Sequence, residues 1–250
     1  MNVTFTSWTT LEVLSVLFVA TIIRSAFGFG EALIAVPLLA LVIPVEVAAP
    51  IAVLVSITVA GIVVLQDWRE IHVRSAGKLV FSSVFGIPLG LLLLKTVAEP
   101  VVKAALATVI IAFSLYSLMA RSRHELKNDK LAWLFGLSSG VLGGAYGMNG
   151  PPLVVYGALR RWSPGRFRAT LQGYFLPASL MVACGYVAVG LWTSTVSRFY
   201  LFSLAPVLVA TLVGRTMNRR MDGSRFRVYI HIVLMIVGSI LLVQAFRGTR

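Results

Sequence analysis

Apolar segments separated by short polar loops fill most of the chain. They run over residues 11–43, 47–65, 79–94, 101–119, 131–159, 169–191, 199–213 and 228–246. Several are long enough to cross about 30 Å of hydrocarbon as a helix. They lack the dyad alternation that a transmembrane β-barrel needs. The pattern predicts an all-α polytopic membrane protein, built as a single membrane domain over residues 1–250.

Two of these segments, 11–43 and 131–159, are interrupted by glycines near their middle. The second interruption, Gly143–Pro152, holds four glycines and two prolines in ten residues. Proline removes a backbone donor, and glycine costs a helix about 1 kcal/mol relative to alanine. Unwound backbone at membrane depth is tolerated only where protein covers it or a cavity receives it. We therefore expect helix breaks that line a cavity at Gly143–Pro152 and, more weakly, at Arg24–Glu31, which is followed by Pro37.

The distribution of Lys and Arg decides how these two segments cross the membrane. If all eight segments cross once, the two sides carry 11 and 10 basic residues. If 11–43 and 131–159 are hairpins that return to their starting side, the counts become 16 and 5. Only the second arrangement obeys the positive-inside rule. We predict hairpins, re-entrant or nearly spanning, with both termini outside.

The hairpins also predict an internal repeat. Each half of the chain becomes one hairpin plus three transmembrane helices, over about residues 8–120 and 130–247. Three is an odd number, so the second half is inverted relative to the first. Phe27–Gly28 matches Tyr146–Gly147 at an offset of 119. Inverted repeats with broken helices near the midplane are typical of secondary transporters.

Composition narrows the function classes. The chain is 58% hydrophobic and 12% charged, with a net charge of +13. Basic cytoplasmic loops explain that charge without nucleic acid as a partner, so the expected partners are the lipid bilayer and a small anion. The sequence has no P-loop, no nucleophile–base pair and no Cys/His/Asp/Glu grouping at metal spacing. We expect no enzyme activity, no metal and no cofactor.

Arg24 and Glu31 are the only charged residues between Glu12 and Glu46. A charge at the bilayer centre costs at least about 2.5–3.5 kcal/mol and usually faces a cavity or a partner. Arg24 is the candidate for binding an anion, since a guanidinium can hold a pair of sulfonate or carboxylate oxygens. Glu31 is the candidate proton-coupling residue. The alternative is a structural Arg24–Glu31 salt bridge that ties the hairpin arms together.

Further candidates come from the backbone of the breaks and from polar residues nearby. Glycines allow backbone N–H groups to approach a ligand, an asparagine amide can donate to an oxyanion, and a helix N-terminus attracts anions. The alternatives are tight helix packing for the glycines and interhelical hydrogen bonds for the polar residues. The predicted substrate-binding residues besides Arg24 are Gly28, Gly30, Gly147, Asn149, Gly150, Pro151 and Gln172, with Ser56 facing the same cavity.

The chain resembles the sulfite exporter TauE/SafE family, also called the 4-toluene sulfonate uptake permease family. The resemblance covers nearly the whole chain and is most specific at Gly143–Leu153, which is similar to the glycine motif of that family's second half. Arg166–Thr170 also resembles the stretch that follows it. In the first half, Glu31 and Ala32 replace glycines of the family pattern. The resemblance implies a bacterial inner-membrane permease for small sulfur-containing or organic anions such as sulfite or sulfoacetate, and the termini predicted to lie outside would then be periplasmic.

These observations together predict a secondary transporter of a small organosulfur anion that works by alternating access. Two alternatives stay open. The breaks could form the filter of a passive anion channel, with half-helix ends facing a pore. The chain could also be a membrane-embedded accessory subunit without transport of its own.

Overall fold

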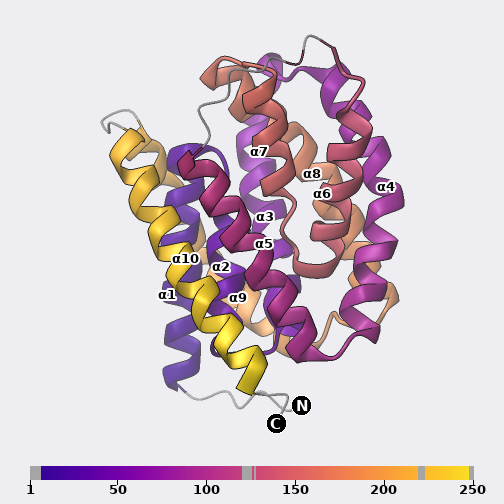
Figure 1. The fold of residues 1–250 in the computed structure, drawn as a ribbon. Helices are drawn as coiled ribbons and strands as arrows, with labels where there is room; N and C mark the ends of the chain where they lie inside the picture. The colour runs from indigo at the N-terminus through magenta and orange to yellow at the C-terminus, as the bar shows by residue number, and fades with distance from the viewer. Residues whose placement is uncertain (1–6, 120–125, 127, 219–222, 248–250) are drawn as a thin grey trace.

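The computed structural model describes residues 7–119, 126, 128–218 and 223–247, which are helical apart from short connections and include no strand. The helices, shown in Figure 1, are α1 (Ser7–Phe27), α2 (Glu31–Leu39), α3 (Val45–Asp67), the 3-10 turn η1 (Trp68–Glu70), α4 (Val73–Thr96), α5 (Glu99–Met119), α6 (Ala132–Tyr146), α7 (Gly150–Leu159), α8 (Pro164–Ala188), α9 (Ser194–Asn218) and α10 (Gly223–Arg247).

Both predicted breaks are present. The first apolar segment divides into α1 and α2, and the fifth divides into α6 and α7. The arms are unequal: α1 has 21 residues and α2 has 9, whereas α6 has 15 and α7 has 10. At about 1.5 Å per residue, α1 alone matches the thickness of the hydrocarbon core, and the other three arms fall short of it. The sequence left open whether the arms are re-entrant or nearly spanning; in the structure α1 is long enough to span, and the other three arms are not.

Among the described residues, six helices are long and apolar enough to cross a membrane, namely α1, α3, α4, α5, α8 and α9. A shorter apolar stretch, Leu234–Phe246, lies in α10. These helices agree with the polytopic membrane protein predicted from the sequence.

Three of the four loops predicted to hold the excess of Lys and Arg meet at one end of the bundle, here called the basic end. The His72 N–H, between η1 and α4, donates to Thr170 Oγ1 of α8 at 3.0 Å. The Leu126 N–H, before α6, donates to the carbonyl of Leu159 at the end of α7 at 2.8 Å. This second bond shows that α6 and α7 form a hairpin that returns to its starting end. The fourth loop, 219–222, lies outside the described residues, as do 120–125 and 127.

The opposite end includes the connection from α4 to α5 and the one from α8 to α9. Lys95, in the last turn of α4, donates to the carbonyl of Val189 just after α8. In Figure 1 the basic end is at the top, while α1 begins and α10 ends at the bottom. The predicted periplasmic termini, 1–6 and 248–250, lie outside the described residues, and their side of the membrane stays a prediction.

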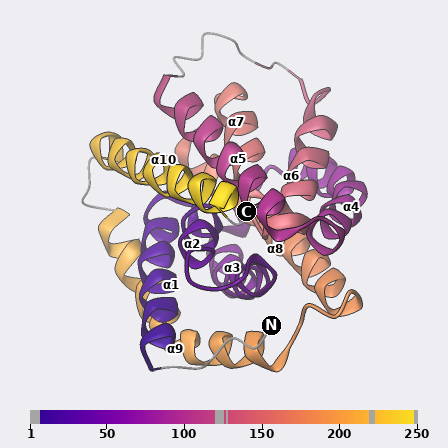
Figure 2. The ribbon, with the colours of Figure 1, turned by 60° about the horizontal axis from the view of Figure 1, so that its bottom comes forward.

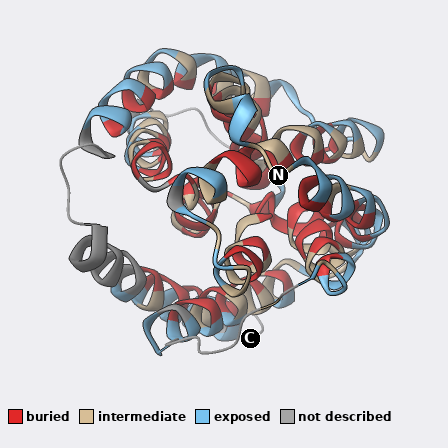
Figure 3. Ribbon diagram, turned by 90° about the horizontal axis from the view of Figure 1, so that it is seen from above, coloured by how far each residue is buried: buried red, intermediate tan, exposed pale blue. Residues whose placement is uncertain are grey.

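The helix α3 is the central helix of the bundle. Two thirds (67%) of its apolar span is buried, compared with 33–50% for the other five spans. It packs against α2, α8 and α9, and Figure 2 shows α2 and α3 in the interior of the molecule. Outward-facing residues are mostly exposed and inward-facing ones buried, as Figure 3 shows.

The surface of the bundle is apolar, as a lipid-facing surface must be. On α4, Phe81, Phe85, Leu89 and Leu92 are 69%, 61%, 56% and 60% exposed. Their spacing places them on one face of the helix. An exposed apolar stripe of this kind in a helical protein marks contact with lipid or with another protein.

Glycines on the other face of α4 allow an unusually close approach to α6. A Cβ added at Gly86 would lie 2.2 Å from the carbonyl oxygen of Leu137, and one added at Gly144 would lie 2.3 Å from that of Ile87. Small residues at helix contacts are typical of membrane proteins, where van der Waals packing drives association. This contact fixes the α6–α7 hairpin against the transmembrane helix α4.

Helix contacts between the two halves are reciprocal. The helix α4 packs on α6 and α9 packs on α1, while α3 packs on α8 and α5 on α10. An inverted repeat that matches α1–α5 with α6–α10 would produce this pairing. The inversion of the two repeats relative to the membrane stays a prediction.

Candidate functional site

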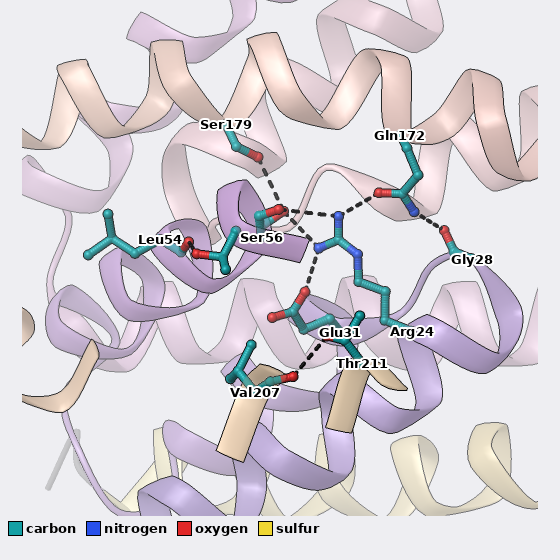
Figure 4. A network of polar contacts seen from close by, with 10 residues as sticks. Arg24, Gly28, Glu31, Leu54, Ser56, Gln172, Ser179, Val207 and Thr211 are labelled. Carbon is teal, nitrogen blue, oxygen red and sulfur yellow. Dashed lines mark hydrogen bonds and ion pairs between the residues drawn. The ribbon is translucent and has the colours of Figure 1, made fainter. Parts of the chain in front are cut away.

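Arg24 lies in the last turn of α1 and is the centre of a buried polar network. Its side chain is 3% exposed. One terminal nitrogen donates to the carboxylate of Glu31 and to Ser56 Oγ, the latter at 2.9 Å. The other donates to Gln172 Oε1 at 2.8 Å and to the Ser56 carbonyl at 3.4 Å. Figure 4 shows side chains from three helices, α2, α3 and α8, converging on the guanidinium of α1.

The network extends to the first helix break. Gln172 Nε2 donates to the carbonyl of Gly28 at 2.6 Å, so one side chain of α8 holds both Arg24 and the unwound backbone. Ser56 Oγ and Ser179 Oγ lie 3.3 Å apart, which links α3 to α8 behind the guanidinium. The arginine is therefore oriented by residues that are distant in sequence.

Left-handed glycines form both breaks. Gly28 has a φ of 84° and Gly147 a φ of 65°, values that favour glycine over residues with a Cβ. A Cβ at Gly28 would lie 2.9 Å from Arg168 Cγ, and a Cβ at Gly147 would lie 2.8 Å from the carbonyl oxygen of Ala49. Arg168 lies in the second turn of α8, and Ala49 lies in the second turn of α3. The two glycines are 119 residues apart, and so are Ala49 and Arg168. The two breaks thus occupy matching positions in the two halves.

The two breaks lie toward opposite ends of the bundle. The helix α8 begins at the basic end, whereas α3 ends there and begins at the other end. Gly28 packs near the start of α8, and Gly147 packs near the start of α3. A hairpin tip therefore borders the central network from each side.

A small cavity separates the two hairpin tips. Its volume is about 20 Å³, which is room for about one water molecule. The lining residues come from both tips and from α3 and α8, namely Arg24, Phe29, Gly30, Glu31, Ala32, Leu33, Ser56, Gly147, Asn149, Gly150 and Phe175.

The structure brings together most of the residues predicted from the sequence. Of those residues, seven line the cavity: Arg24, Gly30, Glu31, Ser56, Gly147, Asn149 and Gly150. Gly28 and Gln172 do not line it but are bonded to each other, and Gln172 also binds Arg24. Pro151 is buried in the first turn of α7 and is not among the lining residues. The Arg24–Glu31 salt bridge, considered above as the structural alternative, is formed.

Several buried polar atoms beside the cavity have no hydrogen-bond partner among the residues that the structure describes. They are Arg24 Nε, Glu31 Oε1 and Asn149 Oδ1. The backbone of Asn149 is held by Ser139, whose hydroxyl donates to the Asn149 carbonyl at 2.5 Å. Because unpaired buried polar groups are costly, these atoms mark hydrogen-bonding capacity that a ligand or water can use.

The site is asymmetric between the halves. At the offset of 119 residues, Arg24 corresponds to Gly143 and Glu31 to Gly150. The glycine at 143 leaves room for Asn149, since a Cβ there would lie 2.4 Å from Asn149 Oδ1. The first hairpin therefore supplies both charges, and the second supplies an amide and backbone.

Sequence reasoning missed two residues of α8. The Arg24 guanidinium lies 5.3 Å from the ring centroid of Phe175, within the range of a cation–π contact. Ser179 contacts Ser56 from the same helix. Residues 172, 175 and 179 have the spacing of one helix face, and this spacing could have identified both once Gln172 was a candidate.

Comparison with known proteins identifies the family. The family model for the sulfite exporter TauE/SafE matches residues 13–241. The chain belongs to this family. The TauE/SafE assignment makes it a membrane transport protein, in agreement with the resemblance seen in the sequence. Neither the curated proteins nor the solved structures compared with the chain gave a match.

Proposed function

We propose that this TauE/SafE protein is an inner-membrane secondary transporter of a small organosulfur anion, such as sulfite or a sulfonate. The observation that carries the proposal is the buried guanidinium of Arg24, which faces a cavity between two helix breaks. A guanidinium pairs with a sulfur oxyanion through two parallel hydrogen bonds. We propose no enzyme activity, and the described residues contain no group of three metal-ligating side chains.

The Glu31 carboxylate occupies the place that a substrate oxyanion would take on Arg24. Glu31 is 1% exposed, and it is paired with the same terminal nitrogen that donates to Ser56. A cavity of about 20 Å³ cannot hold a sulfonate while this carboxylate is in place. An anion must therefore displace Glu31 from the guanidinium.

Proton coupling follows from this competition. Arg24 and Glu31 are the titratable residues among those that line the cavity. A proton on Glu31 removes the negative charge that competes with the substrate, so proton and anion bind together. By linkage, each ligand then raises the affinity for the other by the same factor. The account predicts symport of the anion with a proton.

Alternating access is supported by the positions of the two breaks. Gly28 packs near the basic end of the bundle, and Gly147 packs toward the opposite end. Movement of one hairpin would open the cavity to one side while the other hairpin closes it, as in transporters with broken helices. The small volume of the cavity favours this mechanism over a continuously open anion channel. In our proposal the basic end is cytoplasmic and both termini are periplasmic.

The test is uptake of a radiolabelled sulfonate by proteoliposomes after a pH jump. We expect saturable uptake against the anion gradient when the outside is acidified, which a passive channel cannot produce. Arg24→Gln removes the uptake, whereas Arg74→Gln, at an exposed position outside the cavity, keeps it. Equal uptake by the wild type and Arg24→Gln would exclude Arg24 as the anion-binding residue, and absence of any uptake by the wild type would reject transport of that anion.

A further inference from the structure

Three contacts fasten the first hairpin tip, between α1 and α2, to the first three turns of α8. Gln172 Nε2 donates to the carbonyl of Gly28 at 2.6 Å. The rings of Phe29 and Phe167 meet edge-on, with their centroids 6.0 Å apart. Gly28 also packs on Arg168, where an added Cβ would lie 2.9 Å from Cγ. The tip is thus closed against the helix that begins at the basic end of the bundle.

These contacts lie between the central cavity and the basic end. Phe29 lines the cavity, and its partner Phe167 lies in the first turn of α8. The Phe29 ring therefore connects the cavity wall to the end of the bundle. For the cavity to open toward the basic end, the first tip must move away from α8, and these contacts must break. We call the contacts of Gly28 and Phe29 with α8 the basic gate.

Gln172 is the member of the basic gate that also holds the proposed anion-binding residue. Its Oε1 accepts from Arg24 at 2.8 Å while its Nε2 donates to Gly28, as Figure 4 shows. A guanidinium can only donate and a carbonyl can only accept, so the two partners fix which way the amide points. Gln172 is 1% exposed. Breaking either bond therefore leaves a buried polar group to find a new partner, which is costly.

The matching position in the other half holds an apolar residue. At the offset of 119 residues, Gln172 corresponds to Val53 of α3. Val53 packs against its own hairpin tip, since a Cβ at Gly147 would lie 2.9 Å from Val53 Cγ2. A valine side chain cannot donate a hydrogen bond. At equivalent positions, the first tip is therefore held by a hydrogen bond and the second by van der Waals contact.

We propose that Gln172 is a positioning residue that holds the basic gate closed and links it to the anion site. This inference rests on the proposed function and names the residue that connects binding to gating. Movement of the first hairpin away from α8 must break the bond from Gln172 to Gly28, and Arg24 on the same hairpin is held by the same amide. Removal of the Nε2 donor therefore shifts the population toward a state that is open at the basic end.

Cysteine accessibility from each side of the membrane tests the proposal without a transport assay. Cys184→Ala removes the single cysteine of the sequence, and Ala32→Cys then places a thiol on the lining of the cavity. Its rate of reaction with a membrane-impermeant, cationic methanethiosulfonate is measured in vesicles of both orientations. Ser163→Cys and Ser194→Cys, at exposed positions before α8 and at the start of α9, report which end faces the reagent.

Two variants separate the roles of the amide. Gln172→Glu keeps an acceptor for Arg24 but replaces the donor to Gly28 by a carboxylate oxygen. Gln172→Met removes both bonds with a side chain of similar length. Ser179→Ala is the matched control, because Ser179 lies on the same face of α8 and contacts Ser56 of α3.

We expect both Gln172 variants to raise the labelling rate of Ala32→Cys from the basic end at least about threefold, the shift that the loss of one buried hydrogen bond produces. Labelling from the opposite end stays unchanged, and Ser179→Ala matches the parent protein from both ends. An unchanged rate in either Gln172 variant, or an equal rise from both ends, would overturn the proposal. Uptake by the wild type tests the proposed function separately, so failure of the gate assignment leaves that function standing.

Discussion

Arg24 and Glu31 lie on opposite sides of the break at Gly28 and form an ion pair that is almost completely buried. Their side chains are 3% and 0% exposed. Removing one member of a buried pair leaves an uncompensated charge and costs about 3–5 kcal/mol, whereas replacing both members can be nearly neutral. We predict that Arg24→Gln and Glu31→Gln each lower the thermal midpoint in detergent, and that the double variant is more stable than Arg24→Gln.

The double-mutant cycle also measures the coupling between the two residues. Residues in contact are expected to show a coupling free energy of about 0.5–3 kcal/mol. If the destabilisation of the double variant equals the sum of the two single effects, the buried ion pair does not contribute to stability.

The glycine contact between α4 and α6 gives a second prediction. A Cβ at Gly86 would lie 2.2 Å from the carbonyl oxygen of Leu137, while a Cβ at Gly77 on the same helix meets nothing within 4 Å. Gly86→Ala must therefore push α6 away from α4 and lower the thermal midpoint. Gly77→Ala keeps or raises the midpoint, because alanine favours a helix by up to about 1 kcal/mol. An unchanged midpoint in Gly86→Ala would show that the close approach is not needed.

Asp129 ties the loop before α6 to the end of α7. Burial alone would raise the pKa of Asp129, but hydrogen bonds from Tyr156 and Ser75 and the charges of Arg160 and Lys78 together lower it below its ordinary value. A carboxyl group with a lowered pKa in the folded state stabilises the protein above its ordinary pKa of about 4. That contribution is lost as the pH falls through the folded-state pKa.

Asp129→Asn is therefore less stable than the wild type at neutral pH, and the gap between their thermal midpoints closes as the solution is acidified below about pH 4. Asp67→Asn is the matched control, since Asp67 is 37% exposed and lies 3.8 Å from Arg168. An exposed pair contributes at most about 1 kcal/mol. A gap for Asp129→Asn that stays constant with pH would contradict the role of its charge.

The sequence was sufficient to locate both breaks, because glycine and proline act locally on the backbone at Gly28 and at Gly143–Pro152. The counts of Lys and Arg also predicted that basic loops share one end of the bundle, and three of the four do so in the described part of the chain. Neither kind of evidence predicts how long each hairpin arm is, so the full length of α1 stayed open. The break falls where Gly28 packs beside Arg168 of α8, and that contact depends on tertiary structure.

The candidate site was predictable to a similar degree. Charges in an apolar segment are expensive wherever they lie, so Arg24 and Glu31 were evident from sequence alone. Their partners depend on how α1 packs against α3 and α8. The bond from Arg24 to Gln172 joins residues that are 148 positions apart in the sequence. The cation–π contact of Arg24 with Phe175 is likewise not predicted by the residues around either of them.

The central claim is that Glu31 and the substrate anion compete for the guanidinium of Arg24. The most direct measurement is the dissociation constant of methanesulfonate, whose charge is constant near neutral pH, for purified wild type and Glu31→Gln at two pH values on either side of neutrality. The account predicts tighter binding by the wild type at the lower pH, and binding by Glu31→Gln that is tighter than wild type and independent of pH. Weaker binding by Glu31→Gln than by the wild type, or pH-independent binding by the wild type, would contradict it.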